Sequence, residues 1–141
     1  MNLRRRLWLG LTRNVAFTTP DSEDARLQGR TYAIPFEDVW RATLDLINSE
    51  LRYWRLVSND DEEGIIRARV EGRVERLNSV VTIRIGLDPN AQTRVDALSA
   101  CRTGWADFGV NARRLGRYFR KLDRRLAATR RPDPSPPAIR V

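Results

Sequence analysis

The chain has 141 residues, a length that suits one domain and is short for two. Hydrophobic residues make up 41% and charged residues 31%, and 26 basic against 18 acidic residues give a formal net charge of +8. With no histidine and one cysteine, the chain cannot form an intrachain disulfide, a Cys/His zinc site, or a nucleophile pair of serine or cysteine with histidine. The composition therefore predicts a protein that is not an enzyme and that needs no cofactor or metal.

The positive charge is concentrated at the two ends of the chain. Residues 1–13 carry four basic residues and no acidic one, residues 14–112 carry 12 basic and 16 acidic residues, and residues 113–141 carry 10 basic and two acidic residues. Electrostatic attraction to an anionic surface acts over roughly 8–10 Å at physiological salt, so local charge matters more than total charge. The ends are therefore candidate contact regions. The alternative is a compositional bias with solvated side chains, since 25 of the 26 basic residues are arginine.

The first ten residues join three consecutive arginines to a short apolar run that contains Trp8. This run is shorter than the roughly 20 residues that span a bilayer, and it lacks the features of a secretory signal. Basic residues next to a tryptophan suit an anionic membrane surface or a partner protein. We expect residues 1–29 to form an extended basic arm and lead-in. The expected location is the cytoplasm, with the periphery of the cytoplasmic membrane as the second location.

Residues 30–127 are predicted to form a single α+β domain. Residues 30–34 have the composition of a short strand, and Pro35, Glu37 and Asp38 suit the first turn of a helix that continues to about Leu51. Apolar residues at helical spacing give this helix one buried face: Phe36, Val39, Trp40, Leu44, Ile47 and Leu51.

Four strands and a last helix follow. Apolar residues alternate with polar ones through residues 54–58, 66–70, 81–87 and 95–101, and the connections 59–64 and 88–92 have hairpin composition. A helix then runs from Asp107, as N-cap, to about Ala127. The order β-α-β-β-β-β-α predicts a two-layer α+β sandwich, with an antiparallel sheet and two helices on one face, similar to TATA-box-binding-protein-like or helix-grip folds. Residues 128–141 include four prolines and are predicted to form an extended tail.

The segment from Ser99 to Leu115, SACRTGWADFGVNARRL, joins the last strand to the last helix. Its glycines permit unusual turns and close backbone approach, Asp107 can cap the helix, and Asn111 can hydrogen-bond the preceding loop. An anion site at the helix N-terminus is the functional alternative. We interpret the segment as a structural corner between strand and helix. Its motif residues are Arg102, Gly104, Asp107, Gly109, Asn111 and Arg114.

This corner resembles the signature of the bacterial and plastid domain-of-unknown-function family 1499. All six motif residues match that signature, with Leu115 at its isoleucine position and Cys101 where serine is usual. The resemblance covers roughly residues 30–127 in element order. A Pro-Asn-Cys-Val-Ser-Ser-like segment that the family tends to carry upstream is represented here only by RNVAFTT at residues 13–19, without the cysteine. The resemblance implies the fold and no established activity.

Three function classes are disfavoured by the residues. The acids at 60–63 form a polar hairpin that is typical of a solvated turn, which argues against catalysis. A nucleic-acid-binding face of the sheet would carry arginines at 55, 67, 69, 84 and 94 with Tyr53, but Glu71 and Asp96 share that face. A small ligand could bind between helices and sheet, yet Trp40, Trp54, Phe119 and Leu122 suffice to fill a small core.

The preferred hypothesis is a non-catalytic accessory subunit that docks on protein subunits of a larger, membrane-associated assembly. Because basic and proline-rich ends are ordered only where something holds them, we expect both ends to lie along neighbouring subunits. The occurrence of the resembled family in phototrophs suggests a photosynthetic or other bioenergetic complex. The predicted partner-binding residues are Arg4, Arg5, Arg6, Trp8, Phe17, Arg117, Arg120, Arg124, Arg130 and Arg131.

Overall fold

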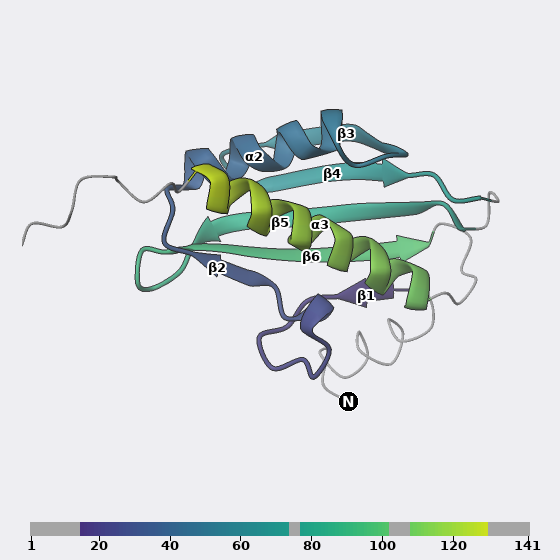
Figure 1. Ribbon diagram of the computed structural model, residues 1–141, viewed down its shortest axis with the longest axis horizontal. Helices are drawn as coiled ribbons and strands as arrows, with labels where there is room; N and C mark the ends of the chain where they lie inside the picture. Colours follow the sequence, from purple (N-terminus) through teal and green to yellow (C-terminus); the bar gives the residue numbers. More distant parts are fainter. Residues whose placement is uncertain (1–14, 74–76, 102–107, 130–141) are drawn as a thin grey trace, which may run out of the picture.

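The computed structural model describes residues 15–73, 77–101 and 108–129, and it contains the predicted order of elements (Figure 1). Three short elements come first, then one helix, four strands and a second helix. The order β-α-β-β-β-β-α is confirmed from β2 onward, and the fold is an α+β sandwich. The elements are β1 (Val15–Phe17), the 3₁₀ helix η1 (Ala25–Leu27), β2 (Arg30–Tyr32), α2 (Phe36–Ser49), β3 (Trp54–Asp60), β4 (Ile65–Val70), β5 (Ser79–Leu87), β6 (Thr93–Cys101) and α3 (Phe108–Thr129).

The sheet has six antiparallel strands in the order β1-β6-β5-β4-β3, and β2 also pairs with β6. The meander from β3 to β6 matches the predicted hairpins. The outer edge of β6 is occupied at both ends, because β1 pairs with residues 98–100 and β2 pairs with residues 93–95. Two short strands thus cover most of an edge that would otherwise expose unpaired backbone groups.

The N-terminal side of the domain differs from the expected extended lead-in. Ala16 on β1 is fully buried and Leu27 on η1 is almost fully buried, so both side chains belong to the core. A strand of three residues is too short to display an alternating pattern, and its position depends on hydrogen bonds to β6 far along the chain. The folded unit of the described residues therefore begins upstream of residue 30.

Both helices cover the same face of the sheet (Figure 1). The space between the layers is filled by side chains with almost no exposed surface, among them Leu46 from α2, Tyr118 and Phe119 from α3, and Ile66 and Ile83 from the sheet. The ring of Tyr118 packs 5.0 Å from that of Phe119 and 6.1 Å from that of Trp54. Side chains of this size each contribute roughly 1.5–3 kcal/mol when they are buried, so this layer supplies much of the stability.

Two tyrosine hydroxyls connect α3 to its neighbours. The Tyr118 hydroxyl lies 2.8 Å from Oγ1 of Thr43 on α2, and the Tyr32 hydroxyl donates to Oδ1 of Asp123 at 2.6 Å. Arg30 donates to the other oxygen of Asp123 at 3.2 Å and lies 5.0 Å from the centre of the Phe119 ring. Burial raises the pKa of both Tyr118 and Tyr32, and the hydrogen bond to Asp123 raises that of Tyr32 further.

These raised pKa values predict a loss of stability in alkali. In the unfolded chain a tyrosine loses its proton near pH 10, whereas Tyr32 and Tyr118 keep theirs in the folded protein, so the free energy of unfolding falls by about 1.4 kcal/mol per pH unit and per tyrosine above that pH. Urea unfolding at pH 9 and pH 11 should show a smaller loss for the double variant Tyr32→Phe/Tyr118→Phe than for the wild type. The exposed Tyr53 provides the control, Tyr53→Phe, which should behave as the wild type. Equal losses in all three proteins would contradict the assignment.

The hairpin between β3 and β4 depends on one glycine. Gly64 has φ +71°, and a Cβ at this position would collide with the backbone carbonyl oxygen of Ile85 on β5. The amide of Ile85 also donates to the carbonyl of Gly64 at 2.8 Å, so the two backbones are held at this close approach. Oδ1 of Asp60 accepts from the amides of Glu62 and Glu63, each at 3.1 Å, which completes the turn.

The substitution Gly64→Ala is expected to lower the free energy of unfolding by at least about 2 kcal/mol. The alanine would be strained by the positive φ angle, and its Cβ would also collide with the backbone of Ile85. The matched control is Gly86→Ala on β5, where a Cβ meets nothing within 4 Å, and its effect should stay within about 1 kcal/mol. Chemical unfolding monitored by circular dichroism measures both values. Similar effects of the two substitutions would show that the close approach at Gly64 is not needed.

Candidate functional site

The strand-to-helix corner contains a buried polar cluster. Ser79 on β5 and both Ser99 and Cys101 on β6 point into the helix layer, where they meet Asn111 in the first turn of α3. Oδ1 of the fully buried Asn111 accepts from the hydroxyls of Ser79 at 2.8 Å and Ser99 at 2.5 Å. Its Nδ2 donates to Sγ of Cys101 at 3.2 Å. One amide side chain thus ties the beginning of α3 to two strands.

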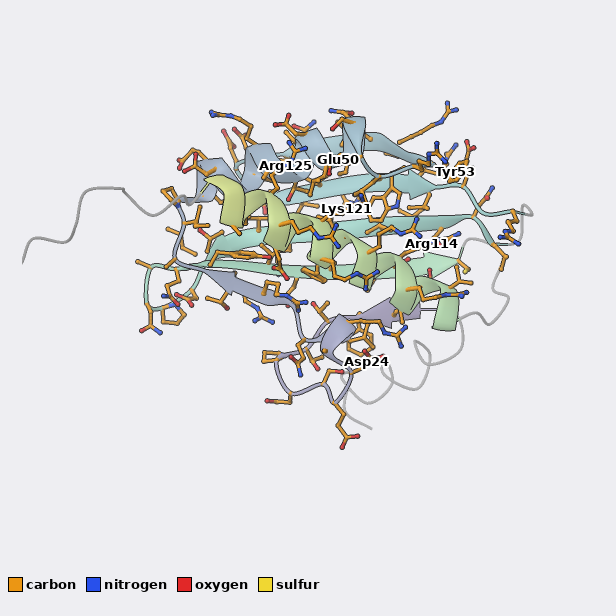
Figure 2. The ribbon with its side chains drawn as sticks, in the orientation of Figure 1. Asp24, Glu50, Tyr53, Arg114, Lys121 and Arg125 are labelled. Atoms are coloured by element: carbon orange, nitrogen blue, oxygen red, sulfur yellow. The ribbon has the colours of Figure 1, made fainter. Side chains whose placement is uncertain are left out.

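Arg114, one turn further along α3, completes the cluster. Its guanidinium donates to the Ser79 hydroxyl, which in turn donates to Asn111 (Figure 2). A buried polar group that loses its partner costs roughly 1–3 kcal/mol, so these hydrogen bonds stabilise the corner. Neither an amide nor a guanidinium is a general base for a serine hydroxyl, so the contacts among these described residues are those of a structural cluster that holds α3 to the sheet.

Three of the six motif residues lie in α3, where Gly109 occupies the first turn near Asn111 and Arg114. Ser79 was not among the predicted site residues, although a serine at an inward position of the alternating series Ser79, Val81, Ile83 signals a buried hydroxyl that needs a partner. Arg102, Gly104 and Asp107 fall outside the described residues, so the expected N-cap and loop contacts do as well.

A second feature is a stripe of exposed arginines along the outer side of α3. They are Arg113, Arg117, Arg120 and Arg124, and their spacing places them on one face of the helix. We call these four residues the arginine ridge. Among the described residues none of them forms an ion pair. By contrast, Arg125 donates to Glu50 at 3.0 Å and lies 3.6 Å from Asp45, so it joins the two helices (Figure 2). Three residues of the ridge, Arg117, Arg120 and Arg124, were predicted to bind a partner.

The face of the sheet opposite the helices carries the arginines that were considered for nucleic-acid binding. Arg67, Arg69 and Arg84 are exposed there and form no ion pair with another described residue. Arg94 is engaged instead, since it donates to Asp96 at 2.8 Å and to the backbone of Gln28 at 2.7 Å. Tyr53, the aromatic residue expected on this face, lies in the turn before β3 with φ 68° and is 65% exposed. On the same face Phe17 is half-buried and pairs with Leu98.

A groove of about 450 Å³ lies between α2 and the β3–β4 turn, and we call it the α2 groove. Its floor is apolar, formed by the half-buried side chains of Phe36, Trp40 and Leu44. The sequence assigned these three residues to the buried stripe of the helix, and the structure leaves part of their surface open at the groove. The remaining lining residues are charged: Glu37, Arg41, Asp61 and Glu62.

The remaining predictions concern metal binding, membrane insertion and the two ends of the chain. Within residues 15–73, 77–101 and 108–129 no group of three or more acidic or cysteine side chains is arranged to hold a metal ion. None of the described helices is long and apolar enough to cross a membrane. The predicted partner-binding residues of the two ends lie outside the described residues: Arg4, Arg5, Arg6, Trp8, Arg130 and Arg131.

Comparison with protein families matches most of the chain to a known family. The family described as a protein of unknown function, DUF1499, matches residues 7–122, which include the polar corner, the α2 groove and the first three arginines of the ridge. Comparisons with curated proteins and with solved structures found no match.

The corner can be tested by removing its central amide. Asn111→Ala leaves the buried hydroxyls of Ser79 and Ser99 without their shared acceptor and should lower the free energy of unfolding by about 2–4 kcal/mol. Asn48→Ala, on the exposed side of α2, is the matched control and should change it by no more than about 0.5 kcal/mol. If the two variants unfold at the same denaturant concentration, the corner does not hold α3 in place.

Proposed function

We propose that this chain, which belongs to the DUF1499 family of proteins of unknown function, is a non-catalytic accessory subunit that docks on a larger, membrane-associated complex. The proposal includes both the folded domain and the two terminal segments as contact regions. A photosynthetic or other bioenergetic complex on the cytoplasmic side is the assembly we favour. Anionic lipid next to that complex is a further contact for the basic N-terminal arm.

The observation that carries the proposal is the arginine ridge. Its first and last members are 11 residues apart on one helix, so they span roughly 17 Å of rigid surface. None of its guanidinium groups is neutralised by another described residue, whereas Arg125 on the same helix has two acidic partners. Arginine is well suited to bidentate contacts with carboxylates. Protein subunits with an acidic surface are therefore the partners that fit this ridge.

The polar corner and the acidic hairpin support a role without chemistry. The corner serines are hydrogen-bonded to an amide and a guanidinium, and neither group activates a nucleophile. The acids of the β3–β4 turn lie at the surface, where Asp60 holds the turn through backbone amides. Binding energy, and not proton or group transfer, is what these residues can supply.

The two alternative functions have less support. Side chains fill the space between the two layers among the described elements, which disfavours a small ligand there. Nucleic-acid binding has in its favour Arg67, Arg69 and Arg84, which form no ion pair with another described residue, but Asp96 and Glu71 lie beside them and Phe17, the aromatic residue that β1 contributes to that face, is half-buried.

Charge reversal on the ridge tests the proposal. The tagged full chain, expressed in its own cells, is solubilised in mild detergent and separated on a native gradient. We expect the wild type to sediment with a large complex and Arg117→Glu/Arg120→Glu/Arg124→Glu to shift to the position of the free chain. The control Arg67→Glu/Arg69→Glu/Arg84→Glu changes the net charge equally on the opposite face and should stay with the complex. A wild-type chain that sediments alone, or equal behaviour of both triple variants, would overturn the proposal.

A further inference from the structure

The floor of the α2 groove is a short ladder of apolar side chains. Phe36, Trp40 and Leu44 are spaced by four residues, so they follow one another along one side of α2. The rings of Phe36 and Trp40 stack at 5.4 Å with an angle of 24° between their planes. Flat aromatic surfaces at a helix edge, partly open to solvent, are typical of grooves that receive extended proline-rich segments.

The edges of the groove are mainly acidic. Glu37 comes from α2, and Asp61 and Glu62 come from the β3–β4 turn, against one basic lining residue, Arg41. The turn is held in place by Asp60 and Gly64, so the carboxylates of Asp61 and Glu62 are presented from a fixed backbone. Neither carboxylate forms an ion pair with another described residue. The groove therefore suits a ligand that combines apolar rings with positive charge.

We propose that the α2 groove binds the C-terminal tail of the same chain, residues 130–141. The tail sequence RRPDPSPPAIRV begins with two arginines and continues with four prolines and one aspartate. Proline rings pack against the Phe36 and Trp40 rings, and the arginines at 130 and 131 pair with the carboxylates at the groove edge. A polyproline II conformation presents both kinds of group without internal hydrogen bonds, so little ordering is needed on binding.

The course of α3 favours this occupant. Asp123 contacts Tyr32, which lies four residues before the start of α2, and Arg125 joins α3 to the C-terminal half of α2 through Asp45 and Glu50. In Figure 1 the C-terminal end of α3 and the first turn of α2 lie at the same end of the molecule. Twelve extended residues reach roughly 37 Å, more than the roughly 21 Å length of α2, so the tail can lie along the groove. β1, the first described element, lies at the opposite edge of the sheet from β3.

This inference goes beyond the proposed function, because it concerns the chain before it is assembled. A tail tethered next to its site has a local concentration on the order of millimolar, so a weak contact suffices. The tail would then stay bound to its own domain until a neighbouring subunit binds it more tightly than the α2 groove does. Binding to the groove does not depend on the identity of that complex, and the two proposals can fail separately.

Disulfide trapping in the purified full chain tests the contact. The pair Asp61→Cys/Ser135→Cys joins the groove edge to the tail, and both substitutions leave the turn contacts of Asp60 intact. The matched control is Asn90→Cys/Ser135→Cys, since Asn90 is exposed on the β5–β6 turn, outside the groove. Under mild oxidation we expect at least a fivefold higher yield of intramolecular disulfide for the first pair, measured by mass spectrometry of the monomer. The buried Cys101 is present in both proteins and does not affect the comparison.

Charge reversal then tests the chemistry of the contact. Adding Arg130→Glu/Arg131→Glu to the trapping pair should reduce the yield to that of the control, and adding Glu62→Arg to that protein should restore part of it. Equal yields for the Asp61 and Asn90 pairs would overturn the proposal. So would disulfides found only between two chains, because they would assign the groove to the tail of a second copy. An effect of charge in the opposite direction would also overturn it.

Discussion

The position of α3 on the sheet depends on the side-chain amide of Asn111. This group is fully buried and bonded to residues of β5 and β6, so it sets both the depth and the rotation of the helix where α3 begins. Once that rotation is set, the apolar side chains of Leu115, Tyr118 and Leu122 must point into the sheet layer. The arginines between them can then point only outward, and the arginine ridge is a geometric consequence of the buried corner.

The other end of α3 is held by different means. Asp123 receives hydrogen bonds from Tyr32 and Arg30 on β2, and Arg125 reaches the acids of α2. The Asp123 contacts bring the end of the helix close to the start of α2, where the α2 groove lies, and the Arg125 contacts join α3 to the C-terminal half of α2. The chain therefore carries a positive surface on one helix and a groove edged with negative charge beside the other. Both surfaces suit recognition of another segment, and neither supplies a nucleophile with a base.

This arrangement shows where the charged residues of each part of the sequence lie in the folded protein. Residues 14–112, which contain more acidic than basic residues, place three carboxylates at the α2 groove, and the basic residues of 113–141 are divided mainly between the ridge and the tail. Some arginines are also used internally, as Arg114 is in the corner and Arg94 is between Asp96 and Gln28. Net charge by itself could not distinguish these roles, because each arginine contributes the same charge whether it is hydrogen-bonded inside the domain, part of the arginine ridge or only solvated.

The sequence by itself determined α2, the meander from β3 to β6, α3 and the packing of both helices on one face. Their apolar residues repeat with a local period, and that period dictates which face is buried. Only the tertiary structure decided the partners of Asn111, the place of β1 beside β6, the position of Tyr53 before β3 and the presence of Asp61 and Trp40 in one groove. These features join residues far apart in the chain, and a polar residue or a three-residue strand has no period that reveals its distant partner.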